Sequence, residues 1–208
     1  MDANPPPPEE IDTQRLARAA ARGEGDPLTV LYERLAPALY TWADFRIRPS
    51  LRTWIEPADL VQEVWCRALL IFERYDAERV SFRYWIFRVA KIVLLEATRK
   101  VGAAEGGALP AGSTARQRVL DDVPDAVAGV SRRLARSEAM ANFSGWIEAL
   151  EGEDRELLLH HGLEGMPHAQ VGVRLGLSEE AVGKRWQRLR TRLEDQALPR
   201  ELLAALST

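Results

Sequence analysis

Apolar residues recur at three- and four-residue spacing through most of the chain, and the alternating pattern of β-strands is nearly absent. This spacing predicts an all-α protein. In the first half we expect helices over about residues 11–22, 27–47, 56–75 and 81–100, and in the second half over about 133–150, 153–161, 167–175 and 178–194. Pro37 lies inside the second of these helices, where a proline predicts a kink or a break.

The helical pattern stops between the two halves. Residues 102–131 are rich in Gly and Ala and lack periodicity, which is typical of a flexible linker. We therefore predict an N-terminal tail with a short helix over 1–25, a helical domain over 26–101, the linker over 102–131, a second helical domain over 132–196 and a C-terminal tail over 197–208. A random coil of about 30 residues spans on the order of 30 Å, so two such domains could bind separate places on one duplex.

Residues 165–193 have the pattern of two helices joined by a tight turn. Pro167 can begin the first helix, Gly176 stands where a C-terminal glycine cap belongs, and Ser178 is a candidate N-cap for the second helix. The second helix carries five cations: Lys184, Arg185, Arg188, Arg190 and Arg192. A helix-turn-helix places such a helix in the major groove of DNA. The alternative is a surface helix pair whose charges are merely solvated.

Charge is distributed unevenly along the chain. The net charge is only −3, but residues 79–100 contain six cations against one carboxylate, Glu96. Those cations are Arg79, Arg83, Arg88, Lys91, Arg99 and Lys100. Two basic segments in a mildly acidic chain indicate two local contacts with a polyanion rather than a general attraction to one.

The composition also bounds the compartment. A single cysteine, Cys66, excludes an internal disulfide and a cysteine-rich zinc site, and we expect no cofactor. The first residues do not form a secretory signal, and no apolar run approaches the ~20 residues of a membrane span. We therefore expect a cytoplasmic protein that makes no contact with a membrane.

The helix over residues 56–75 has an outward polar side. Asp59, Gln62, Glu63 and Cys66 fall on that side, opposite an apolar stripe. Carboxylates beside a glutamine suit a basic partner helix. An exposed acidic face that only solvates the helix is the alternative.

The helix over residues 81–100 mixes cations with aromatic residues. Tyr84, Arg88, Lys91 and Arg99 lie near the side opposite its core stripe. Such a mixture suits single-stranded nucleic acid, because cations follow the phosphates and rings stack on unpaired bases. Tyr84 and Phe87 are the plausible stacking groups, since the other aromatic residues of this helix fit the core better.

Three segments together resemble the bacterial RNA polymerase sigma-70 family, in its two-domain extracytoplasmic-function group. Asp59-Leu-Val-Gln-Glu-Val resembles region 2.2 of that family, and Phe82-Arg-Tyr-Trp-Ile-Phe-Arg-Val-Ala-Lys is similar to its aromatic-basic region 2.3/2.4 helix. Residues 165–193 resemble region 4.2. The order of the segments, the linker and the length also match.

The resemblance implies a polymerase-docking site. By this resemblance Asp59, Gln62 and Glu63 dock on the clamp coiled coil of the largest subunit of core RNA polymerase, and the second domain meets the flap of the second-largest subunit. Members of the group are commonly held inactive by an anti-sigma factor, so such a partner is expected as well.

The resemblance also implies two promoter contacts. The loop 76–81 would hold a base flipped from the minus-10 element, and the helix that follows would grip the strand; the residues implied are Asp76, Arg79, Ser81, Tyr84, Arg88, Lys91 and Arg99. In the minus-35 duplex, Lys184, Gln187 and Arg188 would read bases, and Arg185, Arg190 and Arg192 would contact phosphates.

Some positions depart from the family pattern. Ile92 stands where a polar Asn is common, Gly183 where a cation is common, and Gly172 where an Ala is usual. We expect Gly172 to allow close packing within the helix pair. The pair His160 and His161 stands where an apolar residue is frequent.

Two other classes of protein are alternatives for this sequence. A stand-alone helix-turn-helix regulator, with the N-terminal half as a sensor or dimerisation domain, is the alternative to a sigma factor. An enzyme is disfavoured, because adjacent histidines point about 100° apart on a helix and no carboxylate or cysteine completes a metal set around His160, His161 and His168.

Overall fold

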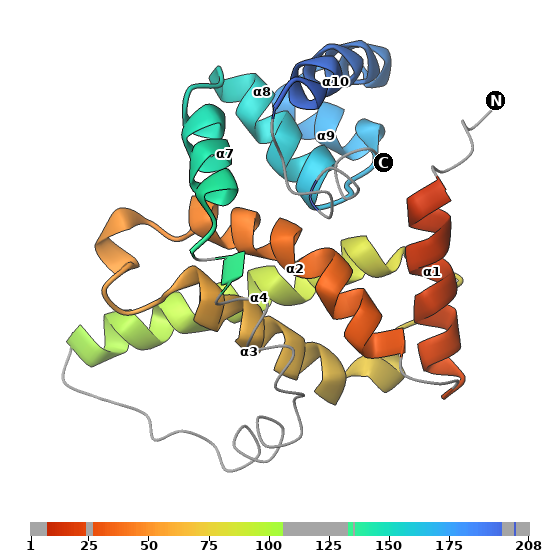
Figure 1. The fold of residues 1–208 in the computed structure, drawn as a ribbon, viewed down its shortest axis with the longest axis vertical. Coiled ribbons are helices and arrows are strands. Elements are labelled where there is room, and N and C mark those ends of the chain that lie inside the picture. The colour runs from red at the N-terminus through yellow and green to blue at the C-terminus, as the bar shows by residue number, and fades with distance from the viewer. Residues whose placement is uncertain (1–7, 24–26, 106–132, 135, 197–201, 203–208) are drawn as a thin grey trace.

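The computed structural model of the protein describes residues 8–23, 27–105, 133–134, 136–196 and 202. All regular structure in these ranges is helical, in agreement with the predicted fold class. The helices form two groups, which we call the N-terminal bundle (residues 8–105) and the C-terminal bundle (residues 133–196). Figure 1 shows the second group lying over α2 of the first. Residues 106–131 of the predicted linker lie outside the described ranges, as do residues 1–7 and 24–25 and, apart from residue 202, the predicted C-terminal tail.

The N-terminal bundle contains four α-helices. They are α1 (Pro8–Ala21), α2 (Pro27–Arg46), α3 (Pro57–Leu70) and α4 (Phe82–Glu105), with short 3-10 turns η1 (Pro49–Leu51) and η2 (Phe72–Arg74) between them. Pro27 and Pro57 stand at the first positions of α2 and α3, where a missing backbone N–H costs nothing. Large apolar side chains fill the space between the helices, among them Tyr32, Leu39, Trp42, Phe82, Ile86 and Phe87.

The C-terminal bundle is built from shorter helices. They are α7 (Glu138–Glu148), α8 (Gly152–Leu157), the π-helical segment η3 (Leu158–Leu163), α9 (His168–Leu175) and α10 (Glu179–Glu194). Ser137 begins α7 as an N-cap, because its side chain accepts a hydrogen bond from the backbone N–H of Met140. Trp186 of α10 packs into the bundle with its ring edge against His161.

Several predicted boundaries need correction. The helix predicted to reach residue 75 ends at Leu70 and gives way to η2, while α4 continues to Glu105, past the predicted end of its domain at residue 101. The predicted break at Pro37 does not occur, and α2 is continuous through it. Pro167 is the N-cap of α9 rather than its first residue, with an extended ψ of 145°.

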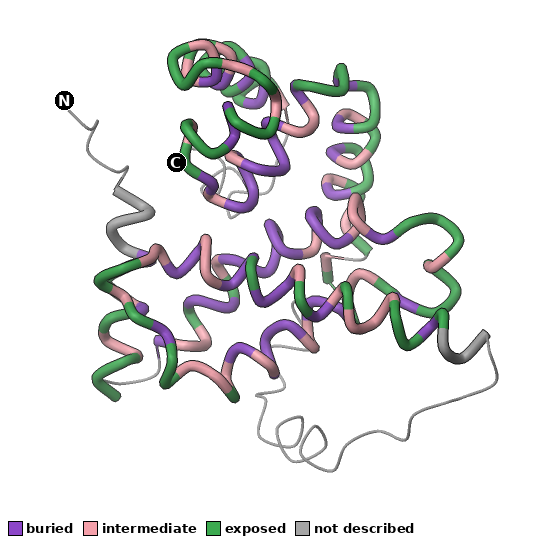
Figure 2. Tube along the Cα trace, turned by 180° about the vertical axis from the view of Figure 1, so that it is seen from behind, coloured by how far each residue is buried: buried purple, intermediate pink, exposed green. Residues whose placement is uncertain are grey.

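The two bundles share one apolar core. Buried residues of α2 and α4 belong to the same cluster as those of α7 to α10. Figure 2 shows buried positions along the helices where the two groups face each other, and exposed positions on the outer side of α10. None of the helices in the described ranges is long and apolar enough to cross a membrane. Because the two bundles cover part of each other's surface, the contact between them determines which side chains remain available to partners.

Candidate nucleic-acid and polymerase interfaces

The hairpin of α9 and α10 has the geometry predicted for a helix-turn-helix. Gly176 closes α9 in the left-handed conformation, with φ 69°, and Ser178 caps α10 by accepting a hydrogen bond from the N–H of Ala181 at 3.2 Å. The turn is tight at Gly172, where a Cβ atom would lie 2.6 Å from the carbonyl oxygen of Leu177. The predicted caps and the predicted close packing at Gly172 are confirmed.

Four apolar residues of α10 point into the bundle. Val182, Trp186, Leu189 and Leu193 are buried, as the sequence pattern predicts. Gln187 and Arg188 are exposed on the opposite side, and Arg188 makes no ion pair within the described part of the chain. The amide of Gln187 and the guanidinium of Arg188 are therefore open to a ligand. These are the groups that contact base edges in a major groove.

The remaining cations of α10 are paired. Lys184 contacts Glu180 at 2.6 Å and Arg190 contacts Glu194 at 3.5 Å, both as exposed pairs one turn apart. Such surface pairs contribute less than about 1 kcal/mol, so either cation can exchange its partner for a phosphate.

Arg185 and Arg192 lie on the side of α10 that faces α8. Both reach the carboxylate of Asp154, Arg185 at 2.5 Å and Arg192 at 2.8 Å, and Arg185 also pairs with Glu153. The hydrogen bond that Arg185 donates to Asp154 is the main reason that the pKa of Arg185 is raised. Arg185 therefore joins α10 to α8, a structural role that the sequence did not reveal, while Arg192 remains about half exposed.

The exposed side of α4 combines cations with apolar residues. Arg88 and Arg99 are exposed, and between them Ile92 and Leu95 leave 52% and 50% of their surfaces in solvent. Ile92 and Leu95 are three residues apart and therefore neighbours on the helix surface, where they form a small apolar patch. Phe87 is fully buried, so its prediction as a stacking group is wrong.

Two other predicted residues of α4 face the C-terminal bundle. The hydroxyl of Tyr84 donates to Gln170 Oε1 at 3.1 Å, and Lys91 Nζ lies 2.6 Å from Glu164 Oε2. Arg83, counted among the cations of this basic segment, is buried and donates to the carbonyl oxygens of Leu163 and Gly162. The C-terminal bundle thus covers one edge of the cationic face of α4.

The loop 76–81 is held by its own side chains and by α1. Asp76 accepts a hydrogen bond from the N–H of Glu78 at 3.0 Å and pairs with Arg79 at 3.2 Å, and Ser81 Oγ accepts from the N–H of Tyr84. Arg79 itself is largely exposed.

Gln14 of α1 fixes both ends of that loop. Its amide nitrogen donates to the carbonyl of Ala77 at 2.5 Å, and its Oε1 accepts from the N–H of Phe82 at 3.0 Å. The same oxygen lies 3.1 Å from the hydroxyl of Tyr75, whose pKa is raised to about 12, chiefly by burial. Sequence reasoning missed Gln14, because nothing local shows that α1 packs against this loop.

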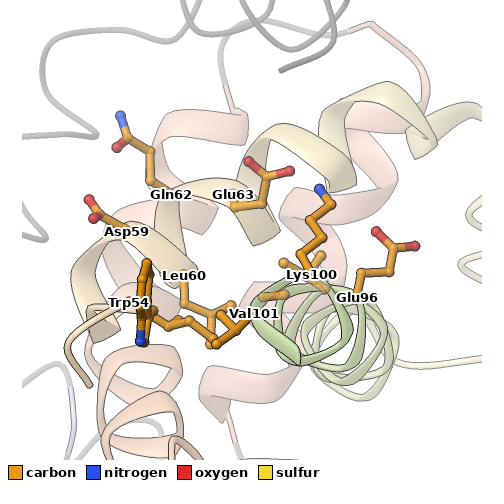
Figure 3. Close-up of a pocket in the computed structure, with 11 residues that line it drawn as sticks. Trp54, Asp59, Leu60, Gln62, Glu63, Glu96, Lys100 and Val101 are labelled. Carbon is orange, nitrogen blue, oxygen red and sulfur yellow. The ribbon is translucent and has the colours of Figure 1, made fainter. Parts of the chain in front are cut away.

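A pocket of about 380 Å³ opens between α3 and α4. All three predicted docking residues line it, together with Trp54, which is 60% exposed. In Figure 3, Asp59 and Gln62 project from α3 above Trp54, and Lys100 extends from α4 on the side of Glu63. Cys66 is buried, so its placement on the outward side of this helix is wrong.

Comparisons with known proteins relate both halves of the chain to one family. Residues 31–103 match the family model for sigma-70 region 2, and residues 146–193 match the model for sigma-70 region 4. The chain is 28% identical over 183 residues to the RNA polymerase sigma factor NccH of Alcaligenes xylosoxydans xylosoxydans, covering 86% of this chain and 91% of that protein. A solved structure of CnrH in complex with the cytosolic domain of CnrY matches 88% of this chain and 94% of its own at 22% identity, with a TM-score of 0.41.

An all-helical chain with a helix-turn-helix and a second basic helix is of the class that binds nucleic acid. The two family models together match more than half of the residues, and the chain belongs to the sigma-70 family, with the regions 2 and 4 that make up its two-domain extracytoplasmic-function group. Proteins of this family are non-catalytic factors of transcription initiation, whose partners are core RNA polymerase and promoter DNA.

Proposed function

We propose that this chain binds core RNA polymerase and directs it to promoters of two elements, where it assists the opening of the duplex. The observation that carries the proposal is the presence of two separate exposed faces with cations on one chain. Gln187 and Arg188 are exposed on α10, and the stripe of Arg88, Ile92 and Leu95 is exposed on α4. Two unlike faces suit an asymmetric site, whereas a regulator commonly binds a two-fold site as a dimer.

The minus-35 element is assigned to α10. Lys184, Gln187 and Arg188 share its outer side and are proposed to contact base edges, while Arg190 and Arg192 contact phosphates. Arg185 would contribute to phosphate binding mainly through its charge, because Asp154 and Glu153 hold its guanidinium. The division follows the general rule that base contacts give sequence choice and phosphate contacts give register.

The minus-10 element is assigned to α4 and the loop before it. Arg79, Arg88 and Arg99 are open to the strand, Asp76 and Ser81 shape the loop for a flipped base, and Tyr84 and Lys91 join them once the C-terminal bundle moves away. Extrusion of a base costs a few kcal/mol. The apolar surface of Ile92 and Leu95 offers unpaired bases a place to pack, which offsets part of that cost.

Polymerase docking is assigned to the pocket between α3 and α4. Asp59, Gln62 and Glu63 line it, with Asp59 exposed and Oε2 of Glu63 buried, and this set of carboxylates and an amide suits a basic helix such as the clamp coiled coil of the largest subunit. Trp54 adds an exposed ring on which an arginine side chain of the partner can lie. By the family resemblance, the C-terminal bundle contacts the flap of the second-largest subunit.

Two further parts of the proposal follow from the family. We expect an anti-sigma factor that competes with polymerase, and such a protein would have to cover the pocket at Trp54 and Asp59 or the open face of α4. We also expect the protein to act in the cytoplasm, where core polymerase is found.

The deciding experiment is a pull-down with core RNA polymerase followed by transcription from defined promoters. The wild-type chain should bind core with one-to-one stoichiometry and support initiation at defined start sites. The double variant Gln62→Ala with Glu63→Lys should lose binding by about a hundredfold, because it places a cation at an interface with a basic helix. Glu73→Lys, which reverses an exposed carboxylate outside the pocket, should bind normally.

The result that would overturn the proposal is a chain that binds duplex DNA but not core polymerase. That outcome would favour the stand-alone regulator and leave the pocket between α3 and α4 to be explained as part of a sensor. Equal binding by the double variant and by Glu73→Lys would move the docking site away from this pocket.

A further inference from the structure

The two bundles meet around one fully buried carboxylate, Glu164, which follows η3. Its Oε1 accepts a hydrogen bond from the indole N–H of Trp42 at 2.8 Å and lies 3.3 Å from the guanidinium of Arg46. Its Oε2 lies 2.6 Å from the ammonium of Lys91 and 2.9 Å from Nδ1 of His160. Both oxygens are thus satisfied by groups of the N-terminal bundle, with His160 as an additional contact within its own bundle.

The donors of the N-terminal bundle form a compact set. Trp42 and Arg46 are one turn apart on α2, and Lys91 reaches the same point from α4. The carboxylates that pair with these two cations, Glu164 and Glu156, both belong to the C-terminal bundle. Among the residues that the structure describes, one N–H and two cations thus converge without an acid of their own bundle, and such a set constitutes a site for an anion.

The charge state of Glu164 agrees with this description. Burial alone would raise its pKa, but hydrogen bonds from His160, Lys91 and Trp42 outweigh burial and lower the pKa to about 2. Glu164 is therefore a buried anion at neutral pH, held by the donors around it.

Further contacts keep the bundles together at this place. Arg83 of α4 donates to the carbonyls of Leu163 and Gly162 at the end of η3, where a cation is favoured. Its aliphatic part lies on Gly165, whose positive φ of 67° and missing Cβ allow an approach at which a Cβ would stand 3.2 Å from Arg83 Cδ. Ser144 of α7 donates to Asp44 of α2 at 2.9 Å.

We propose that Trp42, Arg46 and Lys91 form a binding site for a backbone phosphate of single-stranded nucleic acid, and that Glu164 occupies this site in the closed arrangement as an internal substitute. A phosphodiester presents two anionic oxygens to a set of donors much as a carboxylate does. Lys91 belongs to the proposed minus-10 face, and the site extends that face from α4 onto α2. The inference deepens the proposed function and rests on it for the identity of the natural strand.

The consequence is competition between Glu164 and nucleic acid. While Glu164 is docked, Lys91 is neutralised and Tyr84 is bound to Gln170, so the closed chain offers a strand only the outer part of α4. A strand that takes the site displaces Glu164 and separates the bundles. Because each ligand excludes the other, loss of the internal one must strengthen binding of the external one.

The test uses the full chain and a fluorescein-labelled strand of twelve thymidines at low salt, with affinity read from fluorescence anisotropy. Glu164→Gln should tighten binding at least fivefold, because a neutral amide competes poorly for two cations. Glu156→Gln removes the same charge from the neighbouring carboxylate, which lies 4.0 Å from Arg46, and should change the affinity less than twofold. Equal effects of the two variants would overturn the proposal, since they would reduce it to net charge.

A second pair of variants tests the site itself. In the Glu164→Gln background, Arg46→Ala should abolish the gain in affinity, whereas Arg48→Ala, which removes an exposed cation two residues away, should preserve most of it. If Arg46→Ala leaves the gain intact, Glu164 only holds the bundles together and the donors do not bind phosphate.

A third measurement needs no change at the site. Spin labels at the exposed positions Thr53→Cys and Val173→Cys, on different bundles, should report one narrow distance distribution in the free chain and a broader, shifted distribution when the strand is added. Binding of the strand with an unchanged distance would overturn the competition. Inorganic phosphate, at an equal concentration of phosphate groups, should leave the distance unchanged, and an equal response would assign the site to free phosphate instead of nucleic acid.

These outcomes are independent of core polymerase. If the wild-type chain does not bind core polymerase but Glu164→Gln binds the strand more tightly, the proposed function is wrong and the phosphate site stands. If the wild-type chain supports initiation but the Glu164 and Glu156 variants bind the strand equally well, the proposed function stands and the phosphate site is wrong.

Discussion

The two cationic helices, α4 and α10, handle their charges in different ways. On α10 the pairs are local: Lys184 and Arg190 meet carboxylates of their own helix, and Arg185 meets α8 of the same bundle. On α4, Arg83 and Lys91 are satisfied by the other bundle, across more than 70 residues of sequence. A cationic helix can thus keep its ion pairs within its own bundle, while a helix of similar composition is partly covered by an element distant in sequence.

Arg83→Ala should have the largest effect on the contact that covers α4 and not α10. The substitution leaves the carbonyls of Gly162 and Leu163 without their charged donor and should weaken the closed arrangement by about 3 kcal/mol, or on the order of a hundredfold. The radius of gyration in small-angle X-ray scattering should increase. Arg88→Ala on the exposed side of α4 is the matched control, and an equal increase there would show that Arg83 does not hold the bundles together.

Acid should weaken the C-terminal bundle through His161. Burial, with smaller effects of His168 and Arg83, lowers the pKa of His161 to about 4, and its Nδ1–H donates to the Met166 carbonyl at 2.8 Å. Because the folded pKa is below the unfolded value near 6.5, stability is complete above pH 6.5 and is lost as the pH falls towards 4. The loss should approach about 2–3 kcal/mol.

Denaturant unfolding at pH 7 and pH 5 measures this loss. His161→Asn retains a donor for the Met166 carbonyl and removes the titrating ring, so the difference between the two pH values should shrink. A variant as acid-sensitive as the wild type would assign the effect to other groups.

Gly172→Ala should disturb the hairpin of α9 and α10 without affecting α4. The new Cβ would stand 2.6 Å from the carbonyl oxygen of Leu177, so the turn must shift at a cost of about 2 kcal/mol. Affinity for minus-35 duplex should fall, while binding of the thymidine strand to α4 persists. Gly145→Ala, in an open position of α7, should instead be neutral or stabilising. A stable Gly172→Ala variant with normal duplex binding would contradict the described turn.

Arg188→Ala and Arg185→Ala should distinguish a cation of α10 that contacts DNA bases from one that stabilises the fold. Arg188→Ala should weaken the free energy of binding to its preferred duplex by about 1–3 kcal/mol and change binding to other sequences little. Its folding stability should change by less than about 0.5 kcal/mol. Arg185→Ala should mainly destabilise the fold, because it leaves Asp154 with one cation. Binding to a panel of duplexes and thermal melts distinguish the two, and a uniform loss for Arg188→Ala would make it a phosphate contact.

The local features of the fold were predictable because they depend on neighbours in sequence. Periodic apolar residues located the helices, and Gly176 and Ser178 located the turn of the hairpin, since caps act within one helical turn. The end of α3 was less predictable. Apolar and aromatic residues continue past Leu70 in the same pattern, and the switch to η2 depends on packing of Phe72 and Tyr75 against Phe82.

Site residues were predictable as far as their side chains stay on the surface. Gln187 and Arg188 lie where the pattern of α10 places them. Phe87 and Cys66 were misplaced because helical spacing gives a direction but does not tell how wide the buried face is, and in both helices neighbours cover more than one stripe. Gln14 and Trp54 were not found, because their importance depends on which loop or helix packs beside them.

The amino-acid sequence by itself determined the helical class, the order of the two bundles, the hairpin with its caps and the family to which the chain belongs. These properties follow from short-range periodicity and from motifs that lie within a few turns. Only the tertiary structure decided that Glu164 sits between Trp42, Arg46 and Lys91. Burial of a carboxylate is favourable only where several donors converge, and those donors come from helices that the chain brings together from distant positions.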